Sequence, residues 1–121
     1  MPHTLKDVLP VTARLRDDGH LEVGGVDLVD LAAEHGTPAY VFCEETFRRQ
    51  CRRYREAFPA PDRVYFAAKA FTSIAAFRMA SAEGLGIDVA SGGELHAALA
   101  ALVPPGDIIF HGNNKSDAEL E

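Results

Sequence analysis

The sequence has little that would cross-link the chain or carry it out of the cell. It holds only two cysteines in 121 residues, and the spacing of Cys43 and Cys51 matches no zinc-binding pattern, so we expect reduced thiols. Residues 1–19 mix acidic and basic side chains and lack the apolar stretch of a secretory signal. The longest unbroken apolar run is Ala97–Val103, whereas a membrane span needs about 20 residues. We therefore expect a cytoplasmic protein with no membrane-spanning segment.

Basic residues are also too few to suggest nucleic-acid binding. The chain has 12 lysines and arginines against 18 acidic residues, a net charge of −6, which opposes binding to nucleic acids and anionic membranes. Five arginines lie between residues 48 and 55, but acidic neighbours favour a solvated helix face there. The composition, 47% hydrophobic and 25% charged, is typical of a globular domain.

Residues 1–36 predict a different organisation from the rest of the chain. The Gly24–Gly25 pair separates two apolar runs, which indicates a hairpin of strands 20–23 and 26–28. Apolar residues then recur at helical spacing up to Gly36, which we expect to end a helix in the left-handed conformation. We place a domain boundary between residues 36 and 37.

Beyond residue 37, predicted strands and helices alternate. We expect strands at 39–43, 63–68, 87–90 and 108–111, and helices at 45–58, 73–83, 92–102 and from residue 117. This order is typical of right-handed β–α–β units, so we predict an α/β fold with a parallel sheet. The strands are apolar with almost no alternation, which predicts that both faces of the sheet are covered.

Two further patterns refine this prediction. The side chains of Phe47, Cys51, Tyr54 and Phe58 fall on one face of a helix, which we expect to be buried. Capping boxes begin two other helices, at Ser91-Gly92-Gly93-Glu94 and Ser116-Asp117-Ala118-Glu119. Each box directly follows a strand, at the carboxyl edge where α/β proteins place their ligands.

Three polar residues near that edge could carry chemistry. Lys69 follows the apolar strand 65–68, where burial would make its free amine a nucleophile toward an aldehyde; alternatively its ammonium simply reaches water. Asp88 lies within an apolar strand and needs a partner, either Lys69 or a loop hydrogen bond. His111 could stack on a planar ligand, or it could simply be hydrogen-bonded. His96 has no second ligand at metal-binding spacing, so we expect no metal site.

Four segments together resemble diaminopimelate decarboxylase, a family of fold-type III decarboxylases that use pyridoxal 5'-phosphate (PLP). The segments are Gly36–Phe42 (GTPAYVF), Tyr65–Ala70 (YFAAKA), Gly84–Leu95 (GLGIDVASGGEL) and Phe110–Ser116 (FHGNNKS). The resemblance implies that Lys69 is the catalytic residue that forms the covalent link to PLP, and that Asp88 and His111 line the cofactor pocket.

The resemblance also implies an architecture and a reaction. Residues 37–121 would form the first βα units of a (β/α)8 barrel, and residues 1–36 would belong to a separate β domain. The implied reaction removes a carboxylate from meso-2,6-diaminopimelate to give L-lysine, with the cofactor ring as electron sink, in an enzyme that is a homodimer when complete.

Some features depart from this family pattern. Phe71 stands where many relatives have asparagine after the Lys-Ala pair. Four strands cannot close an eight-stranded barrel, and a helix from residue 117 would be little more than one turn, so we expect the front part of a longer chain that is inactive alone. The alternatives are a related decarboxylase acting on ornithine, arginine or carboxynorspermidine, or a short non-catalytic chain that binds a full-length relative.

Overall fold

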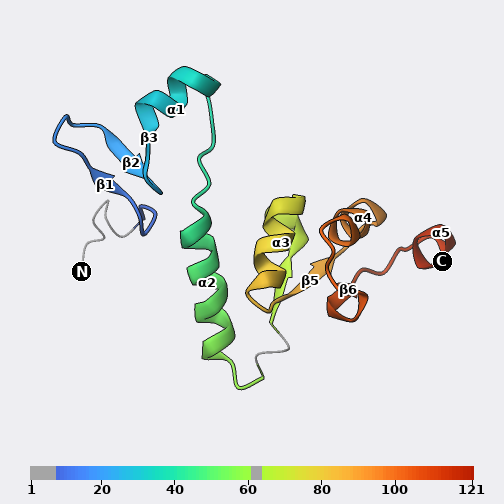
Figure 1. Ribbon diagram of the computed structural model, residues 1–121. Helices are drawn as coiled ribbons and strands as arrows, with labels where there is room; N and C mark the ends of the chain where they lie inside the picture. Colours follow the sequence, from blue (N-terminus) through green and yellow to red (C-terminus); the bar gives the residue numbers. More distant parts are fainter. Residues whose placement is uncertain (1–7, 61–63) are drawn as a thin grey trace. The chain divides into compact units, whose positions relative to one another are not determined.

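The computed structural model describes residues 8–60 and 64–121, and the chain divides into two compact units, Met1–Arg49 and Gln50–Glu121 (Figure 1). Pro61 and Arg63, which belong to a predicted loop and strand, lie outside the described residues. No helix in the described part of the chain is long and apolar enough to cross a membrane.

The first unit is built on a small antiparallel sheet. Its elements are β1 (Arg14–Leu15), β2 (Leu21–Val23), β3 (Val26–Asp27) and α1 (Leu28–His35). The predicted hairpin is confirmed, with Val23 opposite Val26. Gly24 and Gly25 both have positive φ, 63° and 84°, the conformation that favours glycine in a two-residue turn. The short strand β1, which pairs with β2 in order β1-β2-β3, was not predicted.

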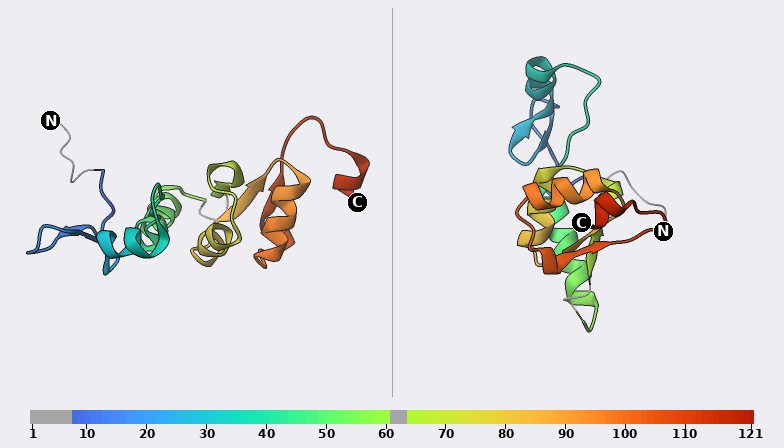
Figure 2. Two further views of the ribbon diagram at one scale, coloured as in Figure 1. Left: turned by 90° about the horizontal axis from the view of Figure 1, so that it is seen from above. Right: turned by 90° about the vertical axis from the view of Figure 1, so that its right-hand side faces the viewer.

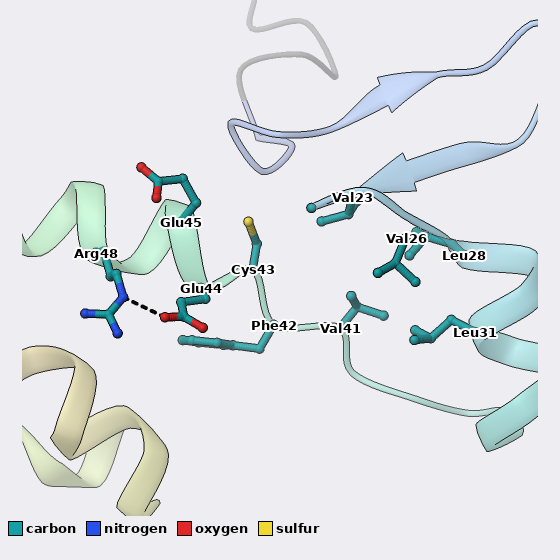
Figure 3. A pocket seen from close by; sticks show the side chains of 11 residues that line it. Val23, Val26, Leu28, Leu31, Val41, Phe42, Cys43, Glu44, Glu45 and Arg48 are labelled. Carbon is teal, nitrogen blue, oxygen red and sulfur yellow. Dashed lines mark hydrogen bonds and ion pairs between the residues drawn. The ribbon is translucent and has the colours of Figure 1, made fainter.

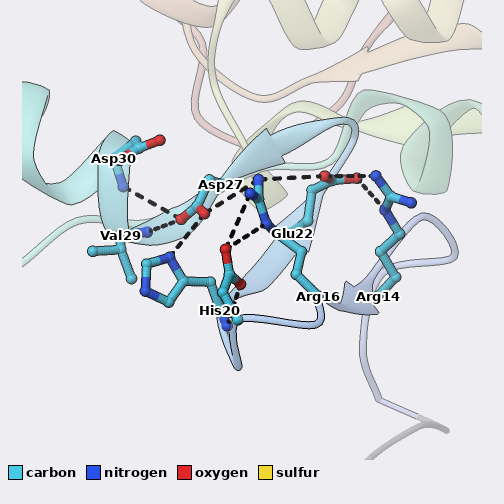
Figure 4. A network of polar contacts seen from close by, with 8 residues as sticks. Arg14, Arg16, His20, Glu22, Asp27, Val29 and Asp30 are labelled. Carbon is cyan, nitrogen blue, oxygen red and sulfur yellow. Dashed lines mark hydrogen bonds and ion pairs between the residues drawn. The ribbon is translucent and has the colours of Figure 1, made fainter.

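A buried carboxylate, that of Asp27, holds the hairpin to α1 (Figure 4). Asp27, 7% exposed, caps α1 by accepting a hydrogen bond from the backbone N–H of Val29 at 2.8 Å. The same carboxylate lies 2.9 Å from His20 Nδ1 and 3.4 Å from the Arg16 guanidinium. Because each partner is cationic or polar, the cost of burying this carboxylate is offset.

Two predictions for the link between the hairpin and the next helix are wrong. Gly36 does end α1, but its φ of 83° and ψ of 176° lie outside the left-handed helical region. Residues 39–43 form no strand, and Tyr40 there is fully exposed. A strand needs a neighbour for its backbone donors and acceptors, and no strand of the described residues pairs with this segment.

The second unit contains the parallel sheet. In chain order the elements are α2 (Glu44–Ala57, which begins in the first unit), β4 (Tyr65–Ala67), η3 (Ala68–Ala70), α3 (Ile74–Ala82), β5 (Gly86–Val89), α4 (Gly92–Ala100), η4 (Pro105–Asp107), β6 (Ile108–Phe110) and α5 (Asp117–Leu120). The strands run parallel in the order β4-β5-β6. The predicted α/β alternation is therefore confirmed.

One face of this sheet carries the core. Helices α3 and α4 contact each other and both contact β5, so they cover the same face (Figure 1 and Figure 2). Ile87 and Val89 of β5 are fully buried together with Phe77 of α3. The rings of Phe66 and Phe77 meet in an edge-to-face arrangement at a centroid distance of 6.3 Å, so Phe66 also faces the helices.

The opposite face is open among the described residues. Side chains alternate along strands, so the row Ala67, Asp88 and Ile109, which the parallel register aligns, points away from the helices. Ile109 is 42% exposed. The expectation that both faces would be covered is therefore wrong, because α3 and α4 pack on one side only.

The apolar stripe of α2 is only partly buried. Cys51 is 5% exposed, as expected, whereas Tyr54 and Phe58 are more than half exposed. The second half of α2 is held to the end of α3 by polar contacts instead, including Arg52 to Glu83 at 3.1 Å.

Candidate functional site

Lys69 lies two residues beyond the end of β4, at the carboxyl edge of the parallel sheet. The chain turns there into the short η3 helix, and Ala68 is completely buried while Lys69 is exposed. The hydroxyl of Thr72 donates to the carbonyl of Ala68 at 2.9 Å, which fixes the turn. Lys69 forms no ion pair with an acidic residue of the described part of the chain. The backbone that carries Lys69 is therefore fixed, and its amine is not committed to a carboxylate among the described residues.

Asp88 and His111 meet at the same edge, on the open face of the sheet. The register pairs Ala67 with Asp88 and Val89 with Phe110, which sets the end of β6 beside β5. His111 follows β6, and its Nδ1 is hydrogen-bonded to Oδ1 of Asp88. The sequence left two partners open for Asp88, either Lys69 or a group in a loop. The structure shows the second, because the partner is His111.

The turn between β5 and α4 is stabilised by its own side chains. Ser91 caps α4 by accepting from the N–H of Glu94 at 3.2 Å. Glu94 reaches back to the N–H of Ala90 at 2.7 Å, one residue before the position that a capping box predicts. The second predicted box is present at Ser116 and Glu119.

The loop after β6 brings a second lysine to this edge. The ammonium of Lys115 lies 5.1 Å from the centroid of the Phe110 ring and donates to the carbonyl of Gly112. Gly112 has a φ of 117°, a conformation open to glycine. Sequence reasoning missed Lys115, although its position five residues after a strand end was a usable signal.

A separate cavity of about 480 Å³ lies in the first unit (Figure 3). Its walls are mainly apolar, including Val23, Leu31 and Val41, and it contains none of the predicted site residues. Cys43 also lines it. Burial raises the pKa of the Cys43 thiol, but hydrogen bonds from Thr12, Thr46 and backbone N–H groups outweigh burial and lower the pKa below its usual range.

One cluster in the first unit has the side chains of a metal site. Ligand atoms of Asp18, His20 and Asp27 lie within 4.8 Å of one another, a grouping that the sequence analysis did not find. The Arg16 guanidinium contacts Asp18 at 3.1 Å and Asp27 at 3.4 Å. Because Arg16 contacts both carboxylates and His20 is hydrogen-bonded to Asp27, the cluster is best explained as an ion-pair network.

Comparison with known proteins identifies the family of the chain. Residues 44–121 match the family model "Pyridoxal-dependent decarboxylase, pyridoxal binding domain". The chain is 46% identical over 113 residues to a diaminopimelate decarboxylase of Bacillus methanolicus, covering 91% of this chain and 26% of that protein. It is 49% identical over 113 residues to the enzyme of Corynebacterium efficiens, covering 93% of this chain and 25% of that protein.

A solved structure is similar in fold. The diaminopimelate decarboxylase of M. jannaschii in co-complex with L-lysine superposes with a TM-score of 0.81 at 36% identity, covering 91% of this chain and 27% of that one. The chain thus spans about a quarter of the length of the relatives it matches. The parallel β–α units are those of the pyridoxal-binding domain, and this chain belongs to the pyridoxal-dependent decarboxylases.

Proposed function

We propose that this chain is the PLP-binding front part of a diaminopimelate decarboxylase, in which Lys69 binds the cofactor. The observation that carries the proposal is the uncommitted amine of Lys69 at the same sheet edge as the Asp88–His111 pair. That edge lies within residues 44–121, which match the pyridoxal-binding domain. The two relatives compared above are diaminopimelate decarboxylases.

The residues at the edge fit this cofactor. PLP carries an aldehyde, which requires an amine that is not tied up in an ion pair, and Lys69 meets this requirement among the described residues. The open face beside it combines apolar Ala67 and Ile109 with the polar Asp88–His111 pair. A mostly apolar wall with few polar groups is typical of small-molecule sites.

Each residue has a distinct task in this proposal. When bound, PLP supplies an electron sink for the carbanion left by decarboxylation. Lys69 would hold the cofactor, because an uncommitted amine is the group that reacts with its aldehyde. Asp88 holds the imidazole of His111 in one orientation, because a hydrogen bond to Nδ1 fixes the ring and its tautomer. His111 would thereby present a ring of fixed orientation to the cofactor.

The architecture of the whole enzyme follows from the same proposal. Residues 37–121 would contribute the first units of a (β/α)8 barrel, and residues 1–36 would contribute to a β domain. The complete enzyme would act on an amino acid, meso-2,6-diaminopimelate, and would be a homodimer. A relative that was crystallised with L-lysine supports this substrate class.

Covalent labelling tests the role of Lys69. The chain is incubated with PLP and reduced with borohydride, which converts the carbon–nitrogen double bond to a stable secondary amine, and the labelled peptide is located by mass spectrometry. We expect one adduct at Lys69, lost in Lys69→Arg and kept in the matched variant Lys115→Arg. An adduct spread over Lys6, Lys69 and Lys115, or confined to Lys115, would contradict the proposal.

A substrate panel tests the reaction. Carbon dioxide release by the native enzyme is measured with meso-diaminopimelate, ornithine, arginine and carboxynorspermidine. We expect kcat/KM to be highest for meso-diaminopimelate. A preference for any of the other three would keep the cofactor assignment and replace the substrate.

A further inference from the structure

A single carboxylate joins two loops at the carboxyl edge of the sheet. Oε1 of Glu119 accepts a hydrogen bond from the backbone N–H of Gly92 at 2.9 Å. Oε2 accepts from the backbone N–H and from the hydroxyl of Ser116, both at 2.9 Å. Gly92 begins α4 after β5, and Ser116 precedes α5 after β6. Glu119 therefore reaches back to Gly92, 27 positions earlier in the chain, and fastens the β6–α5 loop to the β5–α4 turn.

The local capping groups leave this contact to Glu119. The first N–H groups of a helix have no partner within the helix. At α4, Ser91 accepts from Glu94 and Glu94 accepts from Ala90, so neither local carboxylate nor hydroxyl takes the N–H of Gly92. Glu119 supplies that acceptor from the next β–α unit.

The approach of Glu119 to α4 also leaves little room for a side chain at Gly92. A Cβ added at Gly92 would lie 3.2 Å from Cγ and 3.4 Å from Oε1 of Glu119. A Cβ added at Gly93 would meet nothing nearer than the Ser91 hydroxyl, at 4.0 Å. An added side chain at Gly92 would therefore press on Glu119, whereas one at Gly93 would not. Gly92→Ala can accordingly serve as the test and Gly93→Ala as its control.

The loop that Glu119 closes begins at His111. At its first end the imidazole is bonded to Asp88, and in its middle Lys115 donates to the carbonyl of Gly112. At its last end Glu119 holds Gly92 and Ser116. The loop is thus fixed to β5 at one end and to the turn after β5 at the other.

We propose that Glu119 is a positioning residue, which holds the β6–α5 loop in place and thereby keeps His111 on Asp88 at the edge that carries Lys69. The expected effect of Glu119 on PLP binding at Lys69 rests on the proposed function, whereas the hydrogen bond between Glu119 and Gly92 does not. The role needs a carboxylate, because both oxygens accept hydrogen bonds from N–H groups. A glutamine has one acceptor oxygen, and its amide N–H₂ would face a donor.

Amide hydrogen exchange measured by NMR on the full chain tests the contact. We expect Glu119→Ala to speed exchange of the Gly92 amide about tenfold, as for the loss of one charge-assisted hydrogen bond. Glu119→Gln should lie between alanine and the wild type. Asp117→Ala, which removes an exposed acid from the same short helix, should leave Gly92 unchanged. An unchanged exchange rate of the Gly92 amide in Glu119→Ala would overturn the proposal. Equal rates in Glu119→Gln and the wild type would also overturn it, because they would show that the carboxylate charge is not needed and that the side chain only packs.

The second readout follows His111 and the cofactor. We expect Glu119→Ala and Gly92→Ala to broaden the hydrogen-bonded ring N–H signal of His111 and to raise severalfold the PLP concentration that half-labels Lys69. Asp117→Ala and Gly93→Ala should change neither. An unchanged His111 signal in Glu119→Ala would overturn the positioning role. If the wild type takes no label at Lys69, the proposed function fails, while the Gly92 and His111 readouts still decide the role of Glu119.

Discussion

Single glycines decide how closely the strands and loops of the second unit can approach. Gly86 begins β5, and a Cβ placed there would lie 2.4 Å from the ring of Tyr65 and 2.7 Å from the carbonyl oxygen of Asp107. Gly106, in the turn before β6, has open space around it. The two glycines belong to neighbouring elements, but only at Gly86 does close packing exclude a side chain.

Replacing Gly86 by alanine should therefore destabilise the chain by about 1–3 kcal/mol, as for other overpacked sites. The ring of Tyr65 can rotate away, but the backbone carbonyl of Asp107 cannot move without disturbing β6. Urea unfolding followed by circular dichroism measures the change. Gly106→Ala serves as the control and should stay within about 0.5 kcal/mol of the wild type; equal losses for both variants would show that contact at Gly86 is not the cause.

Leu102 is the converse case, a residue with a side chain where glycine fits better. Its φ is 63° just after α4, and it is 81% exposed. The left-handed conformation costs a residue with a Cβ about 1–2 kcal/mol, and little packing is lost with the side chain. Leu102→Gly should raise the free energy of unfolding by about 0.5 kcal/mol after the entropy of glycine is deducted. Ala97→Gly, within α4, should instead lower it by about 1 kcal/mol.

At the scale of elements, polar caps determine where helices begin. Asp27, Ser73 and Ser91 each precede a helix and accept hydrogen bonds from its first turn. Asp27 does more, because it also binds His20 across the hairpin. The hydrogen bond to Asp27 raises the pKa of His20, and the same bond lowers the pKa of Asp27.

These two shifts predict a pH window for the stability of the first unit. The contribution of His20 is complete below about pH 6.5 and is lost as the pH rises through its raised pKa. The contribution of Asp27 is complete above about pH 4 and is lost as the pH falls through its lowered pKa. Unfolding midpoints in urea should therefore be highest between these limits.

Histidine variants separate this pair from other titrating groups. His20→Asn should flatten the loss of stability on the alkaline side. His35→Asn, at the exposed end of α1, should leave it as in the wild type. Identical pH profiles for both variants would contradict the assignment.

Helices were easier to predict than strands because their signals are local. The periodicity and capping residues of α2, α3 and α4 lie within the segments themselves, and the predicted bounds agree within two residues with the structure. A strand depends on a neighbour, which a local pattern does not reveal. The apolar run 39–43 was therefore wrongly predicted as a strand, because no described strand pairs with it.

The Asp88–His111 contact joins residues 23 positions apart through the parallel register, and no pattern in either segment specifies that register. The position of Lys69, by contrast, followed from the end of one apolar strand.

At the scale of the whole molecule, the chain consists of two units with an exposed segment before α2. Tyr40 is fully exposed, and Val41 and Phe42 are each close to half exposed. Residues 39–43 lie in no helix or strand. Proteases cleave exposed backbone outside regular structure most readily.

Brief digestion with chymotrypsin should therefore cut first after Tyr40 or Phe42. The expected product is a fragment beginning near residue 43 that retains Lys69, and mass spectrometry identifies it. A Tyr40→Ser, Phe42→Ser double variant should be cut at least severalfold more slowly. First cleavage after Tyr65, within β4, would show that the second unit opens more easily than this segment.

The order of the parallel sheet also bears on how the chain behaves in concentrated solution. Among the described residues, β5 has a neighbour on each side, whereas β4 and β6 each have one. The outer margins of β4 and β6 thus carry backbone donors and acceptors that another strand could pair with, and such margins are templates for aggregation. Light scattering should show self-association that rises with protein concentration. Ile109→Lys should reduce it if β6 is the growing edge, because a charged side chain on an edge strand opposes pairing with another strand. A longer chain that places its own strands against these margins would gain solubility as well as structure.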